Sequence, residues 1–218
     1  SAKIDKILDL KPDLAIGFSD LQADIAAQLI KAGVNVLVFN QRSMSEIFAM
    51  LYQLAAMVGC TPQAQTWIAE RQAALDAMAQ QVQAWQAAGK RLPRVYFEEW
   101  DEPMICGIRW VSELVQCAGG IDVMADMALA PMGKDRIIAD PLTVAALQPD
   151  IVLGSWCGKK FRPERVMARA GWADVPAVRH QQVFEIKSAD ILQPGPAALT
   201  DGVSQLHRRM ADWVVQHG

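Results

Sequence analysis

Two stretches decide the fold of this chain: "ILDLKPDLAIGFSD" (residues 7–20) and "VAALQPDIVLGSWC" (residues 144–157). Each combines a helical pattern, an x-Pro-Asp turn and an apolar strand that ends in glycine. Pro12 corresponds to Pro149, and the same offset also aligns the patterns downstream. This echo predicts that an α/β unit has been duplicated within the chain.

Helical and strand patterns alternate along the rest of the sequence, which is typical of α/β layering. Ser19 with Gln22, and Ser43 with Glu46, have the spacing of capping boxes and predict two helix starts. Asp140 before Pro141 predicts another. Strands are predicted at 13–18, 34–40, 94–100, 150–156 and 182–186, with helices at 4–10, 20–33, 44–58, 61–89, 109–118, after Pro163 and after Pro196.

The helical pattern that opens at Thr61-Pro62 is unusually long. Its roughly 27 residues would extend about 40 Å at ~1.5 Å per residue. Such a helix could cross two lobes, although a surface helix packed by one stripe explains the pattern equally well. We therefore predict a partial N-terminal α/β lobe (1–60), a lobe-spanning helix (61–90) and a C-terminal α/β lobe (91–218), both lobes being Rossmann-like.

The echo also predicts what is missing from the first lobe. In the second copy, a strand and a helix (94–118) precede the repeated segment, whereas the first copy has no counterpart within the chain. We expect the first lobe to lack its N-terminal strand and helix. The sheet edge that this gap exposes would allow dimerisation through the incomplete lobe.

Bulk properties exclude several classes of function. The 218 residues carry 21 basic and 24 acidic side chains, a net charge of −3, which does not suggest a nucleic-acid or anionic-membrane surface. No apolar run approaches the ~18 residues of a transmembrane helix. The four cysteines and three histidines are dispersed and form no C-x-x-C pattern, so no metal site is predicted.

The stretch "SWCGKKF" (155–161) matches none of the catalytic motifs that its residues suggest. Gly158-Lys159 lacks the spacing of a phosphate-binding loop, and Cys157 has no flanking glycines at nucleophile-elbow positions and no histidine nearby in sequence. Lys159 and Lys160 would favour a thiolate at Cys157, but a small residue at a strand end is the simpler interpretation. The sequence predicts no catalytic residue.

Aromatic and polar side chains instead gather where predicted strands end. Loops at the carboxyl ends of parallel strands line the ligand crevice of α/β folds. Tryptophan planes with a few amide and guanidinium donors suit a large, partly apolar ligand, although each tryptophan taken singly also fits core packing. The acidic run "EEWDE" (98–102) could serve acid–base chemistry or simply solvate the loop. The predicted ligand-binding residues are Phe18, Ser19, Asp20, Gln41, Arg42, Glu98, Trp100, Arg109, Trp110, Trp156, Cys157 and Lys159.

The chain resembles the helical-backbone class of substrate-binding proteins for ABC importers. "KIDKILDLKPDLAIGFSDLQADIAAQLIKAGVNVLVFN" (3–40) resembles the first lobe of that class. "RVYFEEWDEPMICGIRWVSELVQCAGG" (94–120) and "PDIVLGSWCGKKFRPE" (149–164) look like its cobalamin-binding branch, which is related to siderophore and haem binders. The resemblance covers essentially the whole chain.

The resemblance implies a function without catalysis. A corrinoid such as cobalamin would bind between the lobes and pass to a membrane permease, with no cofactor beyond the ligand itself. Relatives dock on the permease through one acidic residue on each lobe, and Asp24 and Asp140 are the nearest carboxylates here, each one position from the match. A comparable cobalamin binder joins the Cys117 position to its terminal helix by a disulfide, but this terminal helix has His207 near that place and no cysteine.

The resemblance places the protein in the periplasm or another extracytoplasmic compartment, while the lack of that disulfide leaves a cytoplasmic location open. Two alternatives to the corrinoid remain. The nearest is a siderophore or haem complex bound by a protein of the same family. The other, from a different class, is a small α/β enzyme that uses Cys157 with Glu98, Glu99 and Asp101.

Overall fold

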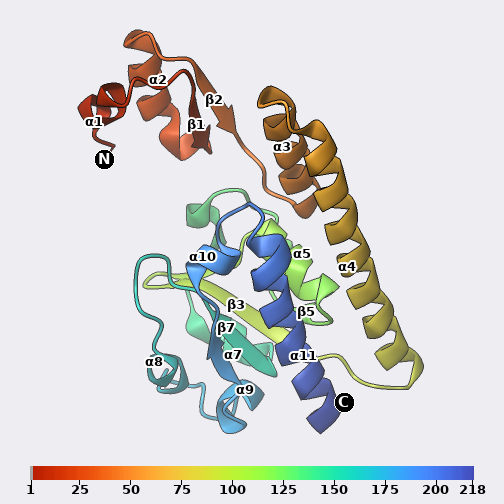
Figure 1. Ribbon diagram of the computed structural model, residues 1–218. Coiled ribbons are helices and arrows are strands. Elements are labelled where there is room, and N and C mark those ends of the chain that lie inside the picture. The colour runs from red at the N-terminus through yellow and green to blue at the C-terminus, as the bar shows by residue number, and fades with distance from the viewer. Residues whose placement is uncertain (1) are drawn as a thin grey trace. The chain divides into compact units, whose positions relative to one another are not determined.

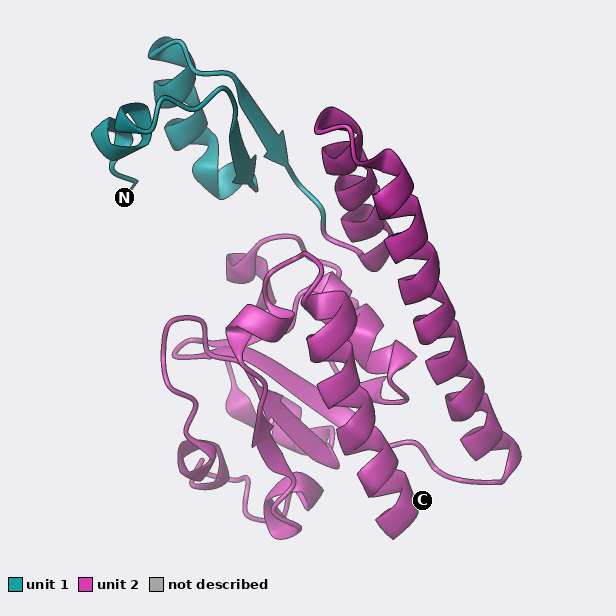
Figure 2. Cartoon of the chain, viewed as in Figure 1, with its two compact units in different colours: residues 1–41 teal, residues 42–218 magenta. Residues whose placement is uncertain are grey.

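A computed structural model describes residues 2–218 of the protein, and Figure 1 shows its helices and strands. The fold is mixed α/β, as the alternating sequence patterns predict. The chain divides into two compact units, residues 1–41 and residues 42–218 (Figure 2). None of the helices within residues 2–218 has both the length and the apolar character that a membrane crossing needs.

Unit 1 is a small α/β element. Its chain runs through α1 (Ile4–Asp9), β1 (Ala15–Phe18), a 3₁₀ turn (Asp20–Gln22), α2 (Ala23–Lys31) and β2 (Val36–Phe39). β1 and β2 pair in parallel, with Ala15 opposite Val36 and Phe18 opposite Phe39. A cavity of about 360 Å³ opens beside this sheet, and apolar side chains of α1, β1, α2 and β2 line it.

The turn after β1 differs from the predicted capping box. Ser19 has φ of 75°, and its hydroxyl accepts a hydrogen bond from the Leu21 amide at 3.2 Å. Gln22 accepts instead from the Phe18 amide, at 2.8 Å. Because the left-handed residue forces a tight turn, the chain first makes a 3₁₀ segment and the α-helix begins only at Ala23.

The echoed segments adopt the same local geometry. Lys11 and Gln148, one residue before the matching prolines, have φ of 48° and 49°. Left-handed backbone is uncommon for residues other than glycine, so its recurrence at two matched positions is not expected by chance. Each segment then enters a strand that pairs in parallel with the next parallel strand along the chain, β1 with β2 and β7 with β8. The geometry supports the predicted duplication.

Unit 2 begins with two helices and continues as a larger α/β domain. The predicted capping box at its first helix is present: the Ser43 hydroxyl accepts from the Glu46 amide, and the Glu46 carboxylate accepts from the Ser43 amide. Its helices are α3 (Met44–Met57), α4 (Thr61–Ala87), α5 (Arg109–Cys117), α6 (Ala125–Ala128), α7 (Pro141–Ala146), α8 (Pro163–Met167), α9 (Pro176–Arg179), α10 (Ser188–Ile191) and α11 (Val203–His217). A 3₁₀ turn (Gly133–Arg136) and a π-helical turn (Ala198–Gly202) complete the helical segments.

The sheet of unit 2 has the order β6-β4-β3-β7-β8, and β5 pairs with the start of β3. β3, β7 and β8 are parallel, whereas β4 is antiparallel to β3 and β6 is antiparallel to β4. The strands are β3 (Arg94–Asp101), β4 (Met104–Cys106), β5 (Ile121–Asp122), β6 (Ile137–Ile138), β7 (Ile151–Gly154) and β8 (Val183–Glu185).

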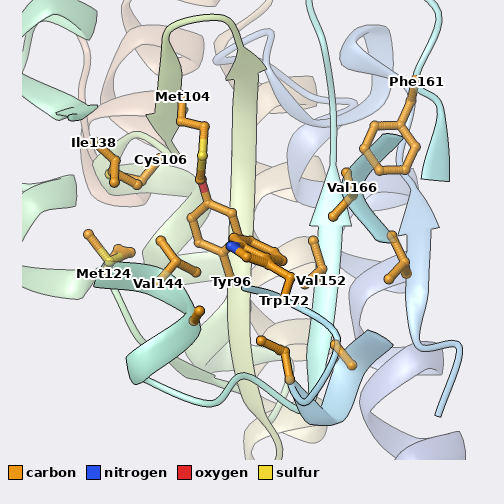
Figure 3. Packing of buried hydrophobic residues seen from close by; sticks show 14 of the residues in the cluster. Tyr96, Met104, Cys106, Met124, Ile138, Val144, Val152, Phe161, Val166 and Trp172 are labelled. Carbon is orange, nitrogen blue, oxygen red and sulfur yellow. The ribbon is translucent and has the colours of Figure 1, made fainter. Parts of the chain in front are cut away.

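The core of unit 2 packs on both faces of this sheet. On one face, Tyr96 of β3 meets Trp172 edge-on with ring centroids 6.1 Å apart, among side chains of α7, α8 and α9 (Figure 3). On the other face, α5 and α11 cover the strands (Figure 1). Tyr96, Trp172 and β7 are essentially inaccessible to solvent, so the sheet is a rigid base for the loops at its edge.

The compact units do not follow the predicted boundaries at residues 60 and 90. Both α3 and α4 belong to unit 2, because α3 packs on α4 and on α5, and α4 also packs on α5. α4 has the predicted length, 27 residues, and its buried residues are Leu75 and Val82. The break in the chain therefore follows β2, at Gln41.

Candidate functional site

The carboxyl ends of β3 and β7 lie side by side in unit 2. The two strands are parallel, and Glu98 of β3 is in register with Gly154 of β7. The loop after β7 therefore starts beside the acidic run at the end of β3, as the strand-end prediction requires. Three carboxylates and three cations meet here, and we call them the strand-end network: Glu98, Asp101, Glu102, Lys159, Arg165 and Arg169.

Glu98 is the buried centre of this network, with 0% of its surface exposed. Arg169 donates to both carboxylate oxygens, at 2.6 and 2.7 Å. The Trp156 indole N–H and the Tyr96 hydroxyl also donate to Glu98, at 3.0 and 3.1 Å. Four donors thus satisfy one buried carboxylate, which is the arrangement that makes a buried charge tolerable.

These contacts shift the pKa values of the partners. Burial raises the pKa of Tyr96 well above its ordinary value, and the negative charge of Glu98 adds to that effect. For Arg169, burial alone would lower the pKa, but the hydrogen bonds and charge of Glu98 outweigh it and raise the pKa. Tyr96 therefore stays neutral and Arg169 stays charged, so neither is suited to exchanging protons near neutral pH.

The second half of the network is nearer to the surface. Lys159 donates to both oxygens of Asp101, at 2.7 and 2.8 Å, and Arg165 reaches Asp101 at 3.2 Å. Arg165 also donates to Glu102 at 2.6 Å. The acidic run is thus neutralised by ion pairs. Of the two readings of the acidic run, the ion pairs therefore argue against acid–base chemistry by Glu98 and Asp101.

Trp156 is placed differently from the prediction of a ligand platform. Only 3% of its surface is exposed, and its ring packs edge-on against Phe161 with centroids 4.8 Å apart. Phe161 fits there because Gly154 leaves the strand surface bare: a Cβ at that glycine would lie 1.7 Å from the Phe161 ring. The indole therefore supports Glu98 from within the core and offers no open face to a bulky ligand.

Trp100 keeps a partly exposed position at the end of β3. A bulge between Glu98 and Trp100 shifts the register with β4 at this point. The indole N–H donates to the Glu102 carbonyl at 2.9 Å, and the Lys159 ammonium lies 5.4 Å from the ring centroid. Of the two strand-end tryptophans, Trp100 is the one whose ring can meet a ligand.

Arg109 and Trp110 form the first turn of α5. Arg109 donates to Glu113 one helical turn later, at 2.8 Å, and Glu113 also accepts from the Met44 amide, at 2.7 Å. The Trp110 indole donates to the Ile191 carbonyl at 3.0 Å. Trp110 is buried, so it joins α5 to the end of α10 rather than presenting a ring to solvent.

Five more predicted residues lie at the ends of β1 and β2 or in the turns that follow these strands. In unit 1, the Ser19 hydroxyl donates to the Asp20 carboxylate at 2.9 Å, directly after Phe18 at the end of β1. Gln41 closes unit 1, and Arg42 opens unit 2, where its amide donates to Glu46 at 2.6 Å. These contacts fix the backbone of the two turns, and a role in ligand binding stays a prediction for all five residues.

The two carboxylates proposed for docking are exposed. Asp24 lies in the first turn of α2 in unit 1. Asp140 caps α7 in unit 2, where its side chain accepts from the Leu142 amide at 2.9 Å, as the Asp-Pro pattern predicts. One oxygen of Asp140 is thus committed to the helix cap, while permease docking by either residue stays a prediction.

All four cysteines are free thiols. Cys106 is buried, and burial raises its pKa to about 12. Cys117 is half-buried, and burial raises its pKa as well. The next residue is Ala118, whose carbonyl oxygen is 3.0 Å from a ring nitrogen of His207. Cys157 and Cys60 are exposed. Within residues 2–218 no three His, Cys, Asp or Glu side chains are grouped to hold a metal.

The thiols should differ in reactivity. We expect iodoacetamide at pH 8 to alkylate Cys157 and Cys60 while Cys106 stays unmodified, because Cys106 is buried and almost wholly protonated. Mass spectrometry of the alkylated peptides measures this, with a urea-unfolded sample as the control in which all four thiols react. Alkylation of Cys106 at the rate of Cys157 in the folded protein would contradict the buried position.

A groove of about 510 Å³ borders the strand-end network. Asp101, Glu102 and Arg169 line one end of it. The other walls are mostly apolar and come from the β3–β4 turn, β6 and the start of α7, namely Pro103, Met104, Ile137, Ile138, Ala139, Pro141 and Ala170.

Sequence reasoning missed Arg165 and Arg169, which neutralise the acidic run. A signal was present: Lys159, Arg162, Arg165 and Arg169 recur every three or four residues in the loop after β7. That loop follows the strand next to the acidic one, so charge complementarity between 98–102 and 159–169 could have suggested the pairing.

Comparison with known proteins gives a consistent picture of the fold. Residues 1–189 match the family described as periplasmic binding protein. The uncharacterized ABC transporter substrate-binding lipoprotein YvrC of Bacillus subtilis is 23% identical over 213 residues. That alignment covers 94% of this chain but 64% of the relative, so the chain spans about two thirds of the length of that protein.

Two solved structures are similar across nearly the whole chain. A periplasmic heme binding protein from Pseudomonas aeruginosa superposes with a TM-score of 0.78 at 19% identity, covering 98% of this chain and 77% of the other. The periplasmic vitamin B12 binding protein BtuF of Vibrio cholerae gives 0.68 at 23% identity, covering 100% and 80%. At these identities the likeness shows a shared fold.

Proposed function

The chain belongs to the periplasmic binding protein family, and from that premise we propose that it is the substrate-binding component of an ABC importer whose ligand is a corrinoid such as cobalamin. The matched family and relatives are binding proteins and not enzymes, which sets aside the alternative of an enzyme built on Cys157. YvrC is a lipoprotein, which favours an extracytoplasmic location.

The observation that carries the corrinoid proposal is the charge balance of the strand-end network. Lys159, Arg165 and Arg169 are each paired with a carboxylate at 2.6 to 2.8 Å. An anionic ferric siderophore would need cations that are not already neutralised. A corrinoid instead presents neutral amides and a broad macrocycle, which suit a charge-balanced rim and an aromatic plane such as Trp100.

Haem is the second candidate, and one observation favours it. Haem iron takes an axial ligand from His, Cys, Met or Tyr. Among the predicted site residues only Cys157 has such a side chain, and its thiol is exposed at the end of β7. A haem complex would therefore depend on Cys157, whereas the corrinoid proposal does not.

Trp100 supplies the direct test of the ligand. We expect hydroxocobalamin to quench the tryptophan fluorescence of the full-length protein saturably, and Trp100→Ala to weaken the affinity roughly tenfold, the equivalent of about 1.4 kcal/mol. Trp100→Phe, which retains a ring, should lose much less. Cys157→Ser should leave cobalamin affinity unchanged.

Parallel titrations with haem and a ferric siderophore separate the candidates. Quenching by haem alone, lost in Cys157→Ser, would replace the corrinoid by haem. Saturable quenching by the siderophore alone would contradict the charge argument. Thermal melting of each variant shows whether an affinity change reflects the site or the fold.

A further inference from the structure

Two histidines far apart in sequence meet at one end of unit 2. His180 directly follows α9, and His217 is the last residue of α11; α9 and the C-terminal end of α11 both lie toward the lower end of the domain in Figure 1. Their ring centroids are 5.6 Å apart, with an angle of 47° between the planes. Both side chains are exposed, so their rings can rotate without disturbing the core.

The ring nitrogens of this pair are available for coordination. Within residues 2–218, neither His180 nor His217 forms a side-chain hydrogen bond. The third histidine differs: Nδ1 of His207 is 3.0 Å from the Ala118 carbonyl, and Nε2 is 2.9 Å from Gln81. His207 also stacks on Trp85, so both of its nitrogens and one ring face are already used.

The separation of the rings fits a shared metal ion. With a metal–nitrogen bond of about 2.0–2.1 Å and the nitrogen roughly 1.1 Å from the ring centre, each centroid would lie ~3.2 Å from the metal. Two such rings would be roughly 4.5 Å apart at a right angle and about 6.4 Å apart in line. The observed 5.6 Å lies inside this range, so coordination needs side-chain rotation but no backbone movement.

The charges around the pair are mixed. His217 ends α11, where unpaired carbonyls favour a cation. Lys90 is close by, since its ammonium donates to the Gly218 carbonyl at 3.0 Å, and it opposes a cation. Arg91 lies over the ring of Trp213, but its charge is paired with Asp150 at 2.7 Å. With two nitrogen ligands and, within residues 2–218, no Asp or Glu side chain grouped with them, the site selects for imidazole-preferring metals.

We propose that His180 and His217 together bind one divalent late first-row transition-metal ion, of the Ni(II) or Cu(II) class, through one nitrogen each. Water fills the other coordination positions, since within residues 2–218 no third metal-ligating side chain joins the group. The site is independent of the ligand proposed for the strand ends. The bound metal links α9 to the end of α11, two segments that no disulfide joins.

Isothermal titration with Ni(II) at pH 7.5 tests this proposal. The protein should carry Cys60→Ser and Cys157→Ser, because exposed thiols would also bind the metal. We expect one Ni(II) ion to bind per chain, saturably. His180→Ala or His217→Ala should each lower the affinity by roughly 10–100-fold or more, since even the loss of a residue that only hydrogen-bonds to a metal ligand costs that much. His207→Gln is the matched control and should leave Ni(II) binding unchanged.

A second readout reports the position of the metal. The ring centroids of Trp213 and His217 are 5.3 Å apart, so bound Ni(II) should quench the fluorescence of Trp213. In Trp213→Phe, this part of the quenching should be lost. Either exposed histidine can be replaced without loss of the fold, and thermal melting checks this. Absence of a saturable equivalent, or equal Ni(II) affinity in His180→Ala and the parent protein, would overturn the proposal.

Discussion

Arg169→Ala is expected to lower the free energy of unfolding by about 3–5 kcal/mol, the usual cost of removing one partner of a buried ion pair. Glu98 is fully buried, and 15% of the Arg169 side chain is exposed. Without Arg169, two charge-assisted hydrogen bonds disappear and the Glu98 charge keeps only Trp156 and Tyr96 as neutral donors. Urea unfolding followed by near-ultraviolet circular dichroism measures the change.

Arg162→Ala is the matched control for this prediction. Arg162 lies in the same segment between β7 and α9 and faces Glu164 at 3.7 Å, but both side chains are more than half exposed. An exposed pair of this kind contributes below about 1 kcal/mol. If Arg169→Ala leaves the chain unfolded, Arg169→Lys keeps the charge without the bidentate geometry and gives a measurable loss. Equal losses in Arg169→Ala and Arg162→Ala would refute the role assigned to the buried pair.

Gly154→Ala is the second large effect, and we expect it to cost about 3 kcal/mol, the upper part of the range for overpacked cores. The added Cβ would lie 1.7 Å from Cε2 of Phe161, whose ring is held against Trp156. Neither side chain has free space, because Phe161 is 2% and Trp156 is 3% exposed. Thermal and urea unfolding measure the loss.

Two glycines serve as controls for this clash. Gly195→Ala, in the same unit, meets no atom within 4 Å. Gly17→Ala, at the position of unit 1 that corresponds to Gly154, would place its Cβ 3.0 Å from the end of the Gln22 side chain and 3.5 Å from Val38, without the severe overlap found at Gly154. Each should change stability by less than about 1 kcal/mol. In addition, Phe161→Ala combined with Gly154→Ala should cost less than the sum of the two single changes, because the clash is then gone.

Local signals predicted most of the framework. The capping box at Ser43 and the cap at Asp140 depend on side chains within three residues of the backbone they bind, so sequence is sufficient to find them. The x-Pro-Asp echo likewise depends on local backbone preference, and Lys11 and Gln148 share their left-handed geometry for that reason. Ser19 caps a 3₁₀ turn rather than the predicted α-helix, which begins only at Ala23.

The site was harder to predict because its contacts are distant in sequence. Trp100 and Trp156 look equivalent, since both end a predicted strand. Their difference comes from Phe161, which fills the bare surface of Gly154 and covers Trp156, and from the bulge that leaves Trp100 half-buried. Neither packing partner nor bulge has a signature in the pattern of apolar residues.

By itself, the sequence determined the α/β class, the order of the longer helices and strands, the duplicated segment and the edge of the sheet where polar and aromatic side chains gather. Each of these follows from periodicity and from caps and turns that act over a few residues. The short elements β4, β5, β6, α6, α9 and α10 were not predicted. Only the tertiary structure decided that Arg169 neutralises Glu98 across 71 residues, that Trp156 is buried, and that His180 meets His217. Those outcomes depend on which surfaces pack together, and burial and charge pairing are properties of the packed chain rather than of any short segment.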